Sequence, residues 1–172
     1  IGSFGHWPAR IAEATPSERT VAYLDPEGVF ELKRPINWIP RVTRQKGGLQ
    51  YHFVPKRSIQ LGGEARALLF VQYFALPPAT LGETVRDLSD RMLAADPALE
   101  VVSQSETTVD GLPALQVEYR RRAEGDGEAV QERVTYFRKG PRVFLLMAAA
   151  PVSLRETHEE AFEKMTASFR VR

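Results

Sequence analysis

Alternating apolar and polar positions predict a β-hairpin over residues 21–38. In its second strand Phe30 and Leu32 face one side, and the charged residues beside them face the other. The turn at residues 25–28, Asp-Pro-Glu-Gly, has proline where φ is fixed and glycine where φ can be positive. Pro35 ends the second strand. The hairpin therefore marks the start of a folded domain.

Beyond the hairpin the periodicity weakens. Residues 35–63 are expected to be rich in loops, with short strands at 50–54 and 58–61. Residues 66–75 are apolar at consecutive positions, which predicts a strand covered on both faces of a sheet.

Two capping boxes, Thr80 with Glu83 and Ser153 with Glu156, each predict the start of a helix. Between the helices, strands are predicted at residues 101–109, 114–122, 129–138 and 142–149. Their short, turn-rich connectors force neighbouring strands to be antiparallel. The predicted fold class is α+β: a meandering antiparallel β-sheet with helices packed on both faces, an α/β/α sandwich. We expect residues 20–172 to form this single domain and residues 1–19 to be an N-terminal arm or tail.

Composition adds constraints rather than an activity. The 172 residues carry a formal net charge of +1, which argues against a dedicated nucleic-acid binder. The sequence has no cysteine, so disulfides and thiolate metal sites are excluded. No apolar run reaches the roughly 18 residues of a membrane-spanning helix. The sequence begins at Ile1 rather than methionine, which is compatible with a removed signal or lipoprotein peptide.

The order and spacing of several elements resemble the PsbP family. They are an aromatic strand at residues 28–32 followed by Pro35 and Trp38, a helix from Leu81, a strand pair at 110–119, and a last helix ending in Ser168-Phe169. Asn37 stands where many members have glycine. The family is named for an extrinsic subunit of the photosystem II oxygen-evolving complex, and a yeast Ran-binding protein and DcrB-type bacterial envelope proteins share its fold. The resemblance covers roughly residues 20–171.

The resemblance implies an accessory role without catalysis or a cofactor. It also implies an extracytoplasmic location, in the periplasm or a lumen-like compartment, peripheral to a membrane. The residues agree on catalysis, because the sequence has no nucleophile elbow, phosphate loop or dinucleotide-binding glycine motif. Three scattered histidines give no metal-ligand spacing, and His158 is expected to be a packed, hydrogen-bonded residue on a helix.

The candidate binding surface is a basic segment. Between residues 32 and 63 the sequence has no acidic residue and seven cations, which are Lys33, Arg34, Arg41, Arg44, Lys46, Lys56 and Arg57. Such a patch would attract an acidic partner. Anionic lipid headgroups are a second candidate. Nucleic acid is a third, because Trp38, Tyr51 and Phe53 could stack bases, but it is not expected at a net charge of +1. A solvated loop balanced by nearby acids is the structural alternative. Trp38, Phe4 and Trp7 are candidate anchors, with a core role as the alternative for Trp38.

The sequence is compatible with three functions. The first is a non-enzymatic accessory subunit that binds and stabilises, or helps assemble, a membrane-associated protein complex with an acidic surface, such as a photosynthetic one. The second is an envelope module that holds a small ligand or, like a chaperone, a hydrophobic segment. The third is an enzyme of unrecognised type, which a pocket of ionisable residues with shifted pKa values would indicate.

Overall fold

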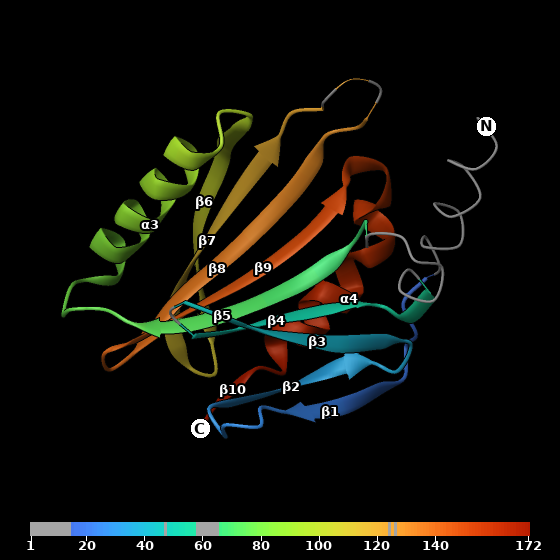
Figure 1. Ribbon diagram of the computed structural model, residues 1–172, viewed down its shortest axis with the longest axis horizontal. Helices are drawn as coiled ribbons and strands as arrows, with labels where there is room; N and C mark the ends of the chain where they lie inside the picture. Colours follow the sequence, from blue (N-terminus) through green and yellow to red (C-terminus); the bar gives the residue numbers. More distant parts are fainter. Residues whose placement is uncertain (1–14, 47, 58–65, 124, 126) are drawn as a thin grey trace.

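In the part of the chain that the structure describes, two antiparallel sheets and two full helices form the fold (Figure 1). The structure is a computed structural model that describes residues 15–46, 48–57, 66–123, 125 and 127–172. Phe4, Trp7 and the strand predicted at residues 58–61 lie outside these ranges. No helix of the described ranges is long and apolar enough to cross a membrane.

Seven strands form the larger sheet. In spatial order they are β3 (Trp38–Gln45), β4 (Gly48–Pro55), β5 (Leu68–Ala75), β9 (Arg142–Pro151), β8 (Val130–Lys139), β7 (Leu112–Arg121) and β6 (Leu99–Val109). Every neighbouring pair is antiparallel, which confirms the predicted meander from β6 to β9. The hairpin from β6 to β7 turns at Asp110 and Gly111, both with positive φ, as an Asp-Gly turn favours.

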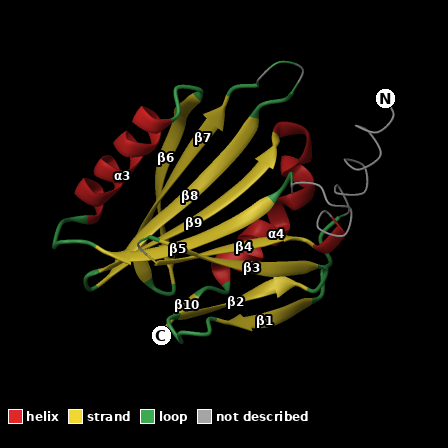
Figure 2. Ribbon diagram, viewed as in Figure 1, coloured by secondary structure: helices red, strands yellow, loops and turns green. Residues whose placement is uncertain are grey.

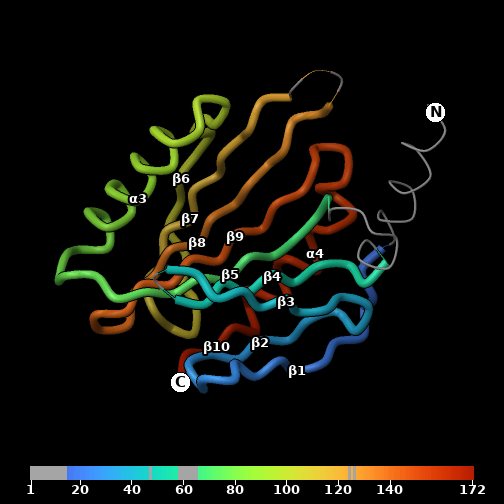
Figure 3. The backbone as a smooth tube through the Cα atoms, viewed as in Figure 1, coloured from blue at the N-terminus to red at the C-terminus, as the bar shows by residue number. Residues whose placement is uncertain are grey.

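A second, three-stranded sheet consists of β1 (Thr20–Leu24), β2 (Phe30–Pro35) and β10 (Arg170–Val171). The β1–β2 hairpin is confirmed, and Gly28 takes the expected positive φ of 73°. The sequence gives no sign of the separate sheet, because β10 is only two residues long and reaches β2 from the end of the chain. Figure 3 shows this return of the chain from the last helix to β2.

The two helices cover opposite faces of the larger sheet (Figure 2). Helix α3 (Leu81–Ala95) packs on β6, β7 and β8. Helix α4 (Arg155–Ala167) follows the 3-10 turn η1 (Val152–Leu154) and packs on β9 and β2. The α+β sandwich with helices on both faces is therefore confirmed, with β1, β2 and β10 adding to the α4 layer.

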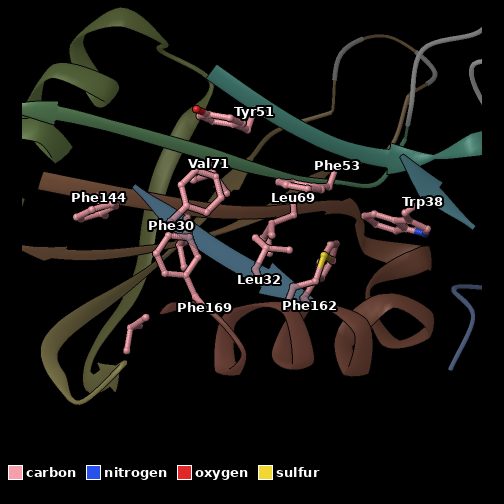
Figure 4. Close-up of a cluster of buried hydrophobic side chains, with 14 of the residues drawn as sticks. Phe30, Leu32, Trp38, Tyr51, Phe53, Leu69, Val71, Phe144, Phe162 and Phe169 are labelled. Atoms are coloured by element: carbon pink, nitrogen blue, oxygen red, sulfur yellow. The ribbon is translucent and has the colours of Figure 1, made fainter. Parts of the chain in front are cut away.

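The core divides into two clusters on either side of the larger sheet. The cluster on the α4 side is rich in aromatic residues; Figure 4 labels Phe30, Leu32, Trp38, Tyr51, Phe53, Leu69, Val71, Phe144, Phe162 and Phe169. The cluster on the α3 side contains Val85, Leu99, Val117, Tyr119, Val134 and Tyr136. Strand β9 serves both clusters, as its two apolar faces predict: Leu146 belongs to the first, and Leu145 packs against the second.

The expected loop after Pro35 is wrong. A two-residue turn at Ile36 and Asn37 leads directly into β3, which forms the edge of the larger sheet. Pro40 and several exposed polar residues make the pattern of β3 unlike that of a strand. An edge strand can contain both, because its outer backbone groups need no partner strand.

One capping box is confirmed and the other is wrong. The Thr80 hydroxyl accepts the backbone N–H of Glu83 at 3.1 Å and caps α3. Ser153 does not cap α4, which begins at Arg155 without a side-chain cap. Its hydroxyl instead donates to the Glu128 carboxylate at 2.9 Å, because η1 moves the start of α4 one residue further along.

Candidate binding surface

The β3–β4 hairpin brings together three of the predicted cations. Arg41 and Arg44 lie on β3, and Lys46 lies in the turn toward β4; all three are exposed. Arg41 is opposite His52, which in turn is opposite Phe70, so Arg41 lies on the α3 side of the sheet. Arg44 is an odd number of positions away and therefore points to the other side. We call Arg41, Arg44 and Lys46 the hairpin cations.

Lys56 and Arg57 are exposed at the opposite end of the same hairpin. The backbone N–H of Lys56 donates to the Asn37 carbonyl at 2.8 Å, beside the start of β3. Because β3 spans eight residues, this end lies roughly 25 Å from Lys46. The segment that is acid-free in sequence therefore forms two separate groups of cations on the surface.

The first two cations of the segment are directed elsewhere. The Arg34 guanidinium donates to the carbonyls of Trp38 at 2.6 Å and Pro35 at 3.4 Å, so it ties β2 to the start of β3. Lys33 is exposed on the outer face of the small sheet, and its backbone N–H donates to the Ser168 hydroxyl at 2.8 Å. Neither belongs to the surface of the hairpin cations.

Trp38 has no exposed surface. Its ring centroid lies 5.8 Å from that of His158 and 6.0 Å from that of Phe162, under α4. This is the core role given above as its alternative. His158 is also fully buried, with Nδ1 hydrogen-bonded to the Leu154 carbonyl at 2.9 Å, as expected.

The hairpin cations are poorly neutralised. Arg44 lies 3.7 Å from the Glu27 carboxylate, and both side chains are largely exposed. Within the described ranges no carboxylate lies within 4.0 Å of Arg41, Lys46, Lys56 or Arg57. Elsewhere carboxylates accompany most of the partly buried arginines, such as Arg121, Arg133 and Arg155.

An aromatic pair adjoins Arg41 on the α3 side of the sheet. The ring centroids of His52 and Phe70 are 5.0 Å apart, and both residues are partly buried. Burial, and then the nearby positive charge of Arg41, lowers the pKa of His52 from its usual value. A neutral His52 adds no second positive charge beside Arg41, and its ring and that of Phe70 form an aromatic surface there, which suits a partner that presents both acidic and apolar groups.

The groups with the most perturbed surroundings have structural roles that the sequence did not reveal. Buried Asp25 accepts hydrogen bonds from the Tyr51 hydroxyl, the Tyr73 hydroxyl at 3.3 Å and the Val29 backbone at 3.0 Å. Burial and the bond to Asp25 raise the pKa of Tyr51. Asp25 thus fixes the β1–β2 turn to β4 and β5. In the sequence Asp25 is simply the residue before a turn proline, and that pattern does not indicate a buried carboxylate with these partners.

A second group joins helix to sheet on the α3 side. The Tyr119 hydroxyl lies 2.8 Å from both the Tyr136 hydroxyl and the Ser89 hydroxyl of α3. Burial and this bond raise the pKa of Tyr136. Among the described residues, no three histidine or carboxylate side chains gather as metal ligands would.

The whole arrangement is the PsbP-like α+β fold. The solution structure of cyanobacterial PsbP (CyanoP) from Synechocystis sp. PCC 6803 matches with a TM-score of 0.66 at 15% identity, over 89% of this chain and 92% of that one. The Ran-binding protein Mog1p of Saccharomyces cerevisiae matches with a TM-score of 0.60 at 14% identity, over 90% and 96%.

LpqN of Mycobacterium tuberculosis, described as involved in cell envelope biogenesis, matches with a TM-score of 0.54 at 12% identity, over 89% of this chain and 90% of that one. No protein-family model matches the sequence, and no curated protein matches it. At these identities the likeness establishes the fold alone. The predicted resemblance to the PsbP fold is confirmed, and function has to be argued from the surface.

Proposed function

We propose that this chain is a non-enzymatic accessory module that binds an acidic, membrane-associated protein complex and stabilises it or helps it assemble. The hairpin cations provide the contact. One observation carries the proposal: in a protein of net charge +1, Arg41 and Lys46 have no carboxylate within 4.0 Å among the described residues, and Arg44 has one exposed partner. Exposed, solvated charge contributes little to a fold, whereas it attracts and orients an oppositely charged partner.

The fold supports the accessory role by analogy. PsbP-like structures include a Ran-binding protein and a protein involved in cell envelope biogenesis, so the fold is compatible with binding and with work at the envelope. We accordingly propose an extracytoplasmic site of action, peripheral to a membrane. The organism's own partner is expected to present an acidic surface with apolar groups that contact His52 and Phe70.

A charge-reversal experiment tests the proposal. The variant Arg41→Glu, Arg44→Glu, Lys46→Glu is compared with the wild type in pull-downs from native membranes of the source organism. We expect at least a tenfold loss of the captured complex, and a loss of wild-type capture as salt rises, since exposed charges are screened beyond about 8 Å at physiological ionic strength. Vesicles of anionic phospholipid, added as a competitor, distinguish a lipid surface from a protein partner.

The matched control reverses three cations away from the hairpin, Arg86, Arg120 and Lys139, all of them exposed. It changes the net charge by the same amount, so capture should remain near the wild-type level. Equal loss in both variants would mean that total charge matters rather than the hairpin. Undiminished capture by the hairpin variant would refute the proposal.

A further inference from the structure

The four sheet edges of the described fold differ in how they are protected from pairing with another strand. Edge strand β3 contains Pro40 and the cations Arg41 and Arg44. Edge strand β6 carries Glu100 and Glu106 and has an irregular register at Val102. Charges, proline and bulges are the usual protections of an edge. Edge strand β10 is only two residues long.

Strand β1 has none of these protections. Its sequence, Thr-Val-Ala-Tyr-Leu, has no charge and no proline, and it pairs with β2 without a bulge. Val21 is 41% exposed and Leu24 is 57% exposed, so apolar surface flanks this edge. An exposed, uncharged edge is the surface to which an extended segment of another protein adds as a further strand.

The register shows which backbone groups are available. The N–H of Asp25 donates to the Phe30 carbonyl, and the Arg19 carbonyl accepts the N–H of Ile36, at 3.0 Å each. In an antiparallel pair the hydrogen-bonded positions alternate, so Val21 and Tyr23 also bond to β2. Consequently Thr20, Ala22 and Leu24 direct their N–H and C=O groups outward, and these three residues provide the docking positions of the edge.

The side chains beside this edge define a chemistry on each face. Tyr23 points inward, with its ring 5.1 Å from that of Phe53, so Val21 lies on the same inner face. On the outer face Ala22 is opposite Lys33, and a groove of about 570 Å³ runs from β1 across β2 to α4. Its walls include Thr20, Ala22, Glu31, Lys33, Lys164 and Arg170.

Lys33 dominates the charge of this groove. Within the described ranges it has no carboxylate within 4.0 Å, whereas Lys164 pairs with Glu160, Arg170 with Asp110, and Glu31 with Arg172. Ala22, the residue between Lys33 and the open edge, has the short side chain that lets the lysine ammonium reach past it.

We propose that β1 is a strand-addition site for an extended segment of the partner in which apolar and acidic residues alternate. Apolar side chains of the added strand contact Val21 on the inner face, and an acidic side chain beside Ala22 binds Lys33 on the outer face. This rests on the proposed function as a binding module, and it adds a second contact, distinct from the hairpin cations. A second copy of β1 fits less well, because it would bring no acid to Lys33.

The probe is a short labelled peptide in which valine and glutamate alternate, and a valine–lysine peptide is its control. Fluorescence anisotropy should show binding of the glutamate peptide only. Lys33→Glu should weaken that binding about fivefold and create binding of the lysine peptide. Ala22→Pro removes an outward N–H without breaking a bond to β2 and should weaken binding at least tenfold, whereas Ala22→Ser should not.

Amide hydrogen exchange of the unaltered protein tests the geometry independently of any variant. With the glutamate peptide, the N–H groups of Thr20, Ala22 and Leu24 should become protected. Peptide binding without this protection, or binding that Lys33→Glu leaves unchanged, would overturn the proposal. Protection that appears without peptide as protein concentration rises, together with dimers in sedimentation, would overturn it in favour of self-pairing.

The two proposals fail separately. If the reversed hairpin cations abolish peptide binding and Lys33→Glu does not, the peptide binds at the hairpin and the strand-addition site is refuted. If the peptide binds at β1 but capture from membranes survives reversal of the hairpin cations, the strand-addition site stands and the role of the hairpin is refuted.

Discussion

The hairpin cations and the arginines beside α4 are the same kind of residue in opposite surroundings. Arg133 donates to Glu118 and to Glu159 at 2.6 Å each, and Arg155 donates to Glu159 at 2.7 Å. These four partly buried side chains, which we call the α4 network, join β7, β8 and α4. The hairpin cations are exposed and, apart from Arg44, have no carboxylate within 4.0 Å among the described residues.

The difference separates charge that helps to hold the fold from charge that is exposed to solvent. A partly buried arginine that loses its carboxylates leaves buried charge without a partner, which is costly. An exposed cation has water as its alternative partner and contributes little to the stability of the fold. Arg133 and Arg41 both occupy polar positions of strands, so only the three-dimensional surroundings distinguish the two kinds.

The largest expected effect comes from Trp38, which lies in the basic segment but belongs to the core. Trp38→Ala removes a fully buried side chain packed against His158 and Phe162. The cavity should lower the free energy of unfolding by about 4 kcal/mol, measured by urea denaturation. Trp38→Phe keeps most of the apolar volume, so its free energy of unfolding should decrease much less. A stable Trp38→Ala variant with impaired partner capture would instead make Trp38 a binding residue.

The next effect breaks the α4 network. Arg133→Met keeps the aliphatic volume and removes the guanidinium from Glu118 and Glu159. We expect a loss of about 2 kcal/mol in the free energy of unfolding, because hydrogen bonds to charged, partly buried groups are lost. Arg133→Lys retains the charge but not the planar set of donors, so its free energy of unfolding should lie between those of the wild type and Arg133→Met. A loss below about 0.5 kcal/mol would mean that the α4 network stabilises the fold no more than exposed ion pairs do.

Acid should weaken the same network by a smaller amount. Burial alone would raise the pKa of Glu159, but the hydrogen bonds from Arg133 and Arg155 outweigh it and hold this pKa below its usual value. Its stabilisation is therefore complete above the unfolded-state pKa of about 4.3 and is lost as the pH falls through the lower, folded-state pKa. The stability difference between wild type and Glu159→Gln should be constant from neutral pH to about 4.3 and shrink below it.

Glu132 provides the contrasting control for this pH dependence. Burial raises the pKa of Glu132 despite its bond to Arg121. A raised folded-state pKa favours the native state below the unfolded-state pKa, and that stabilisation is lost as the pH rises through the folded-state pKa. The free energy of unfolding of the wild type, relative to that of Glu132→Gln, should therefore increase as the pH falls toward about 4.3. Parallel pH profiles for the two variants would contradict the assignment of opposite shifts.

Local patterns were sufficient for most of the fold. The meander from β6 to β9 depends on apolar alternation and Asp-Gly or Gly-Pro turns, both of which are encoded in neighbouring residues. Strand β3 was missed because an edge strand needs only one partner and can be polar on its outer side. Strand β10 was missed because its pairing with β2 joins opposite ends of the sequence.

The site was less predictable than the fold. Counting charges located the basic segment, but β3 separates its cations into two groups, and Arg34 is occupied by backbone carbonyls. The edge of β1 could not be inferred from composition, because its significance depends on what protects the other edges. The clamp formed by Asn37, whose side chain bonds the backbone of Thr15 at 3.1 Å and Ser17 at 2.9 Å, is also a long-range contact.

The smallest expected effect on stability belongs to the hairpin cations themselves. Arg41→Ser, Arg44→Ser, Lys46→Ser removes three neighbouring positive charges and one exposed ion pair, the one between Arg44 and Glu27. Lost attraction to Glu27 and relieved repulsion among the cations oppose each other, so the free energy of unfolding should change by at most about 0.5 kcal/mol. The same variant should nevertheless lose most of its partner capture.

That combination is what separates the two kinds of charge, and urea denaturation at low and high salt measures it. For the triple serine variant, stability should depend on salt less than in the wild type, because the mutual repulsion that salt screens has been removed. Arg133→Met should remain destabilised at both salt concentrations, since a partly buried pair is screened much less. A hairpin variant as destabilised as Arg133→Met would mean that its cations hold the fold, and the binding surface would have to be sought at the edge of β1.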